Sequence, residues 1–95
     1  MGRRNTGEVE MESHEARLNI TWSGQNGDLV DPIAYDAPDK DILQWATEAI
    51  RTGGVPGITA DLNANLTDFV VDRFAATADV PMNRIVLRPK TPFGL

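Results

Sequence analysis

The strongest helical pattern in the chain spans residues 36–54, with the sequence DAPDKDILQWATEAIRTGG. Its apolar residues recur at spacings of three and four, as in a helix with one buried face. This stripe consists of Ile42, Trp45, Ala46, Ala49 and Ile50. Asp36 offers a capping side chain, and the glycine pair at 53–54 offers a left-handed stop. We therefore predict one helix from about Lys40 to Thr52.

Two strands are predicted before this helix. Between residues 17 and 23, Leu18, Ile20 and Trp22 alternate with polar residues, which is the pattern of a strand buried on one face. Residues 24–28, GQNGD, are rich in turn formers and are predicted to be a five-residue turn. Residues 29–35 are predicted to be the second strand. Pro32 cannot donate a ladder hydrogen bond, so we expect this strand at a sheet edge.

Two further strands are predicted after the helix. Val55 and Ile58 belong to a connector that is expected to lay both side chains against the core. Residues 61–65 show no clear pattern. Residues 67–74 are rich in β-branched and aromatic residues, which favours a third strand, and residues 83–88 are predicted to form the last one.

The predicted order of elements is ββαββ, an α+β domain in which one helix packs across a mixed four-stranded sheet. We expect the last strand to lie beside the first, at the centre of the sheet, with Ile85 and Leu87 inward. Arg84, Val86 and Arg88 then point outward. We predict an N-terminal tail over residues 1–15, a domain over 16–90 and a C-terminal tail over 91–95.

The aromatic residues are expected to serve the core. Trp22 and Trp45 lie on the apolar faces of the first strand and the helix, which predicts that both are packed inside. Tyr35, Phe69 and Phe74 are expected in the core or at its margin.

In its element order, the chain resembles the ubiquitin-like β-grasp family over about residues 16–94. The resemblance also rests on the last strand, Arg84-Ile85-Val86-Leu87-Arg88, and on the short tail after it, which ends Phe93-Gly94-Leu95. Ubiquitin-like modifiers have a similar apolar last strand with basic residues, followed by an extended tail that ends in glycine.

The resemblance implies a protein modifier. In such modifiers an activating enzyme adenylates the glycine carboxylate, and the chain is then transferred to a partner thiol or amine. Some members carry extra residues after the glycine, which a peptidase removes. By this resemblance Gly94 is the conjugated residue and Leu95 is the residue removed, and the partners include an activating enzyme and a processing peptidase. A related function is that of a sulfur carrier, in which the terminal glycine carries the sulfur as a thiocarboxylate. Alternatively, residues 91–94 form a simple turn.

Four residues near the C-terminus are candidate partner contacts: Arg84, Arg88, Lys90 and Phe93. The basic ones suit an acidic partner surface, or they are an ordinary solvated strand face. Phe93 is either an exposed anchor or folds back onto the domain. The alternative function is a non-conjugated β-grasp adaptor or accessory subunit, as in an oxygenase or a secretion machine, that binds a partner through a sheet face.

The chemistry available to the chain is limited. It has no cysteine, His14 is its only histidine, and Ser13 and Ser23 are its only serines. No phosphate-binding loop or metal-ligand motif is present. We therefore expect no enzymatic activity, no cofactor and no metal.

Composition and charge indicate where the protein is located and which classes of partner it binds. The 95 residues are 41% hydrophobic and 24% charged, which suits one small globular domain. No apolar run reaches the length of a membrane span, and no signal-peptide pattern follows Met1, so we expect a cytoplasmic monomer. Residues 28–72 carry nine acidic and two basic residues, a net charge of −7, whereas residues 73–95 carry four basic residues and one acidic, a net of +3. An acidic body disfavours nucleic acid.

Overall fold

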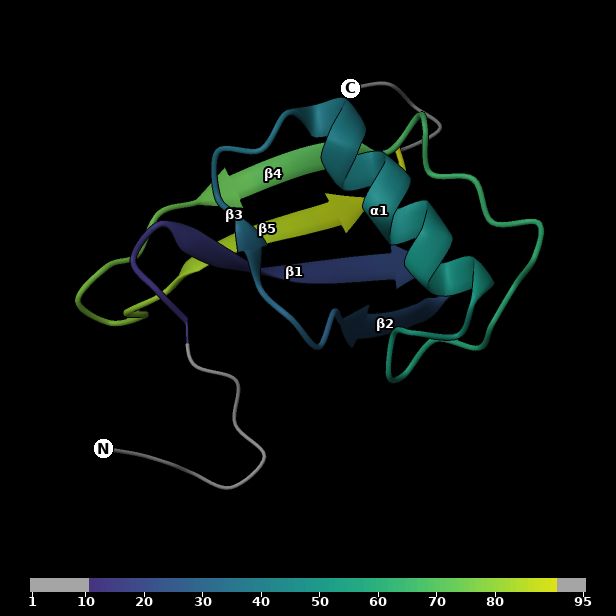
Figure 1. The fold of residues 1–95 in the computed structure, drawn as a ribbon, viewed down its shortest axis with the longest axis horizontal. Helices are drawn as coiled ribbons and strands as arrows, with labels where there is room; N and C mark the ends of the chain where they lie inside the picture. The colour runs from purple at the N-terminus through teal and green to yellow at the C-terminus, as the bar shows by residue number, and fades with distance from the viewer. Residues whose placement is uncertain (1–10, 91–95) are drawn as a thin grey trace.

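The computed structural model describes residues 11–90 and contains one helix and a mixed sheet of five strands (Figure 1). In chain order the elements are β1 (Glu15–Trp22), β2 (Gln25–Asp28), β3 (Ile33–Ala34), α1 (Asp39–Arg51), β4 (Val70–Phe74) and β5 (Asn83–Arg88). The α+β class is confirmed. The predicted number of strands, four, is wrong.

The first hairpin is tighter than predicted. β1 and β2 pair antiparallel with Trp22 opposite Gln25, so only Ser23 and Gly24 form the turn. Both turn residues have positive φ, 52° and 77°, as the two central residues of a type I′ turn require. The five-residue turn predicted over 24–28 is therefore wrong, because most of that segment is strand β2.

The predicted second strand over 29–35 is also wrong, since only Ile33–Ala34 form strand β3. β3 pairs antiparallel with the beginning of β1, and Glu15 lies opposite Ala34. Asp31 and Pro32 separate β3 from β2, and Pro32 has no N–H with which to continue a ladder. The segment thus divides into two short strands that both pair with β1.

The centre of the sheet is as predicted. The strand order is β2-β1-β5-β4, and β5 runs parallel to β1, with Leu18 opposite Ile85 and Ile20 opposite Leu87. All four side chains are fully buried. β1 begins at Glu15, one residue inside the predicted N-terminal tail.

Helix α1 differs from its prediction by one residue at each end. Pro38 occupies the N-cap position without any side-chain hydrogen bond, so the predicted cap at Asp36 is wrong. The backbone carbonyl of Pro38 accepts from the N–H groups of Asp41 and Ile42. Gly53 follows the helix with a φ of 75°, which confirms the left-handed stop.

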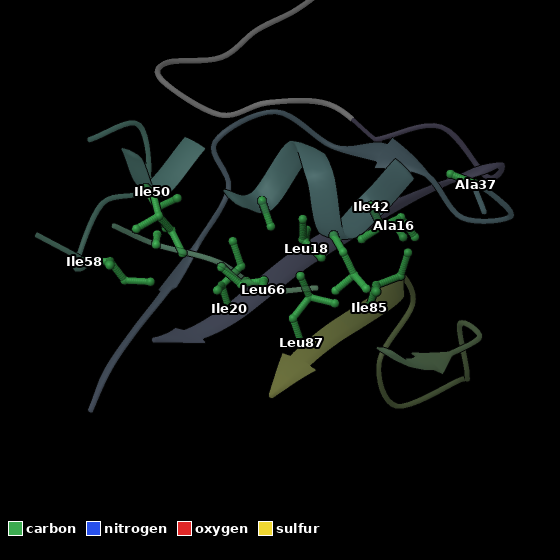
Figure 2. Close-up of a cluster of buried hydrophobic side chains, with 14 residues drawn as sticks. Ala16, Leu18, Ile20, Ala37, Ile42, Ile50, Ile58, Leu66, Ile85 and Leu87 are labelled. Atoms are coloured by element: carbon green, nitrogen blue, oxygen red, sulfur yellow. The ribbon is translucent and has the colours of Figure 1, made fainter. Parts of the chain in front are cut away.

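The core lies between α1 and one face of the sheet, as Figure 2 shows. The connector between α1 and β4 closes it with Val55 and Ile58, as predicted, and also with Ala64 and Leu66. A backbone hydrogen bond from Phe69 to the carbonyl of Leu66 turns the chain there, so β4 starts at Val70 rather than at 67.

Two aromatic predictions require correction. Trp45 is 44% exposed and Phe74 is 43% exposed, so neither is part of the core. Trp45 lies at the edge of the apolar face of α1, so its side chain is partly exposed to solvent. Trp22, in contrast, packs against the core margin, 5.8 Å from the ring of Phe69, and its Nε1–H donates to Asp61.

Candidate functional site

The face of the sheet opposite α1, called the open face below, is the candidate site. Side chains alternate along a strand, so the neighbours of the buried residues in β1 and β5 point to this face. α1 is the only helix within residues 11–90, and it covers the other face (Figure 1). The open face comprises Glu15, Arg17, Asn19, Thr21, Asn26, Asp28, Val70, Asp72, Phe74, Arg84, Val86 and Arg88.

One row across the open face carries two arginines and an aromatic ring. Arg17 in β1 lies opposite Arg84 in β5, and Arg84 lies opposite Phe74 in β4. The guanidinium carbon of Arg84 is 5.1 Å from the centre of the Phe74 ring, in cation–π geometry. In this row, called the Arg17–Arg84–Phe74 row, two positive charges lie beside a partly exposed aromatic ring.

The carboxylates on this face already have partners. Asp72 accepts from Nε of Arg88 at 2.8 Å, and Asp28 accepts from the side-chain amide of Asn19 at 2.7 Å. Glu15, two residues before Arg17, accepts from the backbone N–H of Glu12. Within residues 11–90, neither Arg17 nor Arg84 forms an ion pair, and the buried Nε of Arg84 has no hydrogen-bond partner.

The β1–β2 half of the open face is internally satisfied. The amide of Asn26 donates to Asn19 and to the hydroxyl of Thr21, and Asn19 donates back to Asn26 and to Asp28. These groups need no external partner, because their polar atoms already bind one another. The one buried side-chain polar atom without a hydrogen-bond partner among residues 11–90 is Nε of Arg84 in β5.

A hollow of about 280 Å³ lies at the end of the sheet where β4 ends and β5 begins. It is lined by Met11, Glu12, Ser13, Ala76, Pro81, Met82 and Asn83. Ala76 follows the end of β4, and Met82 directly precedes β5. Met82 is 37% exposed, which gives the hollow an accessible apolar side.

A second groove runs along the outer side of α1, with a volume of about 480 Å³. Lys40, Leu43, Gln44, Thr47, Glu48, Arg51, Asn65 and Thr67 line it. Several of these polar groups serve the fold, since the hydroxyl of Thr47 accepts from the N–H of Leu66 and Arg51 donates to the carbonyl of Ala64.

The predicted partner contacts are only partly brought together. Arg84 and Arg88 share the open face, and Lys90 is exposed just beyond β5. Phe93 and Gly94, the predicted anchor and conjugated residue, lie outside the described residues, as does Leu95. Arg17 and Phe74 were missed as site residues. The alternation in β1 already placed Arg17 opposite to Leu18, but its pairing with Arg84 required the strand order.

Residues 11–90 contain no cluster of three or more histidine or acidic side chains arranged to hold a metal ion. No helix in that part of the chain has the length and apolar character needed to cross a membrane. Comparisons with protein-family models, curated proteins and solved structures found no match to this chain.

Proposed function

We propose that this chain is a ubiquitin-like β-grasp protein that acts as a modifier, activated at the carboxylate of Gly94 after Leu95 is removed. The parallel pairing of β1 and β5 at the centre of the sheet carries the proposal. One helix crosses that sheet, and the chain leaves β5 through exposed Pro89 and Lys90. This is the arrangement in which a glycine-ended tail can be handled without unfolding the domain.

The chemistry of this function is supplied mostly by partners. A peptidase hydrolyses the Gly94–Leu95 peptide bond with one water. The freed carboxylate attacks the α-phosphate of ATP and releases pyrophosphate, and a partner thiol or amine then displaces AMP from the acyl adenylate. The chain itself contributes only a reachable glycine, which lacks a Cβ and fits a narrow channel. Because ATP is needed, we expect this protein in the cytoplasm.

Intact-mass spectrometry of N-terminally tagged protein, recovered from its native cells under denaturing conditions, tests the proposal. We expect a species ending at Gly94 and heavier adducts joined through Gly94 to lysine. The Gly94→Val variant is the matched control, since it leaves residues 11–90 unchanged and should form no adduct. A chain that remains intact to Leu95, without adducts, under several growth conditions would contradict the proposal.

A second candidate is a non-conjugated adaptor that binds its partner through the open face. The Arg17–Arg84–Phe74 row favours it, because two half-buried arginines and an exposed aromatic ring lie together without involving the tail. Deleting residues 93–95 separates the two functions. An adaptor keeps its partner after the deletion, whereas a modifier loses all of its adducts.

A further inference from the structure

The Arg17–Arg84 pair is electrostatically unfavourable in the isolated domain. The two residues are directly paired on adjacent strands and point to the same face. Like charges on directly paired residues repel each other and destabilise a sheet. The three carboxylates near them, on Glu15, Asp28 and Asp72, are bound to other groups. An external anion at this row would remove the repulsion.

The donors at this row suit a carboxylate. Each guanidinium carries five N–H donors in a planar fork, which matches the two oxygens of a carboxylate. Within residues 11–90, neither arginine donates a hydrogen bond to any protein group. Nε of Arg84 is buried and does not reach an external ligand, so the terminal N–H groups are the donors available to one. The guanidinium carbon of Arg84 lies 5.1 Å from the centre of the Phe74 ring, which is cation–π geometry.

We propose that the open face binds an acidic segment of a partner protein. A glutamate carboxylate of that segment sits between Arg17 and Arg84. The binding requires neither Gly94 nor an activating enzyme, so it is independent of the conjugation proposed above.

The probe is the peptide acetyl-Glu-Ser-Glu-Ser-Leu-Ser-amide, titrated into the ¹⁵N-labelled full chain while amide NMR signals are followed. We expect saturable shifts at β1, β4 and β5 next to the row, with a Kd on the order of 0.1–1 mM. The same peptide with glutamine in place of both glutamates should bind at least about tenfold more weakly, because its neutral amides do not pair with the guanidinium groups.

Variants of the chain locate the site. Arg17→Gln and Arg84→Gln should each weaken binding about tenfold or more, and Arg84→Lys should fall between wild type and Arg84→Gln because lysine keeps the charge without the fork. Lys40→Gln removes one positive charge from exposed α1 and should leave the Kd within about twofold. A dispersed NMR spectrum shows that each variant is folded.

Three outcomes overturn the proposal. The first is no saturable shift with the acidic peptide at millimolar concentration. The second is equal binding of the glutamine peptide. The third is binding that appears only after Glu8 and Glu10 are both changed to glutamine in the full chain, which would assign the row to glutamates of the same chain rather than to a partner.

Discussion

The guanidinium of Arg73 in β4 donates to the backbone carbonyl of Tyr35, 38 residues earlier in the chain, at 2.6 Å. The same side chain donates to the carbonyl of Ala37 at 2.8 Å and pairs with the carboxylate of Asp39 in the first turn of α1. One arginine thus joins an edge strand to the segment that leads into the helix.

Replacing Arg73 should therefore destabilise the domain. Arg73→Ala leaves two carbonyl oxygens without their donors, and we expect it to lower the free energy of unfolding by about 2–4 kcal/mol. Asp39→Asn removes only the ion pair, whose carboxylate is 65% exposed, and should cost no more than about 1 kcal/mol. Urea unfolding followed by circular dichroism measures both. Equal losses for the two variants would show that the ion pair, not the carbonyl contacts, matters.

The two arginines Arg17 and Arg88 should respond oppositely to loss of charge. Arg17 faces another arginine, whereas Arg88 pairs with Asp72 at 2.8 Å. At low ionic strength we expect Arg17→Gln to raise the free energy of unfolding by about 0.2–1 kcal/mol. Arg88→Gln should lower it by up to about 1 kcal/mol. Both differences should shrink in high salt, which screens surface charges. Destabilisation by Arg17→Gln that persists in high salt would argue against the repulsion.

Two glycines of the first hairpin should differ in their tolerance of alanine. A Cβ on Gly27 would lie 2.0 Å from the carbonyl oxygen of Pro56, so the backbone of β2 or of the connector must move. We expect Gly27→Ala to lower stability by at least about 2 kcal/mol. A Cβ on Gly24 meets nothing within 4 Å, and only its φ of 77° is unfavourable, so Gly24→Ala should lose about 1 kcal/mol. Thermal unfolding of both variants gives the comparison, and a larger loss at Gly24 would refute it.

Two leucines of the connector offer a matched test of the core. Leu66 is fully buried and Leu62 is 81% exposed, although both belong to the same irregular segment. Leu66→Ala should lower the free energy of unfolding by about 2–5 kcal/mol, since it leaves a cavity under α1. Leu62→Ala should change it by no more than about 0.5 kcal/mol. A similar small effect at both positions would mean that the connector does not close the core.

The error in the predicted first turn has a clear physical origin. Residues 24–28 contain Asn26-Gly27, a strong turn signal, yet Ser23 and Gly24 form the turn. Gly27 is not part of the turn. It lies against the backbone of Pro56, where a Cβ would not fit. Local composition cannot distinguish a glycine needed for a turn from a glycine needed for close approach to a remote segment.

The candidate site was predictable in part. Arg84 and Arg88 were identified because strand alternation alone places them opposite to Ile85 and Leu87. Phe74 was assigned to the core or its margin by its apolar character, although its position in β4 turns it to the open face. Arg17 was not predicted as a site residue, because its place in the row depends on its pairing with Arg84, 67 residues away in the sequence.

The sequence by itself determined the helix, the strands β1 and β5, and the burial of Leu18, Ile20, Ile85 and Leu87 in those strands. Periods of 3.6 and 2 are local properties of the backbone, so a run of a few residues is enough to reveal them. Only the tertiary structure decided that Arg73 binds the segment before α1, that Leu66 completes the core, and that Arg17 meets Arg84. Each of these contacts joins two segments that are far apart in the sequence and meet only when the sheet and helix pack. A local sequence pattern contains no information about such a contact.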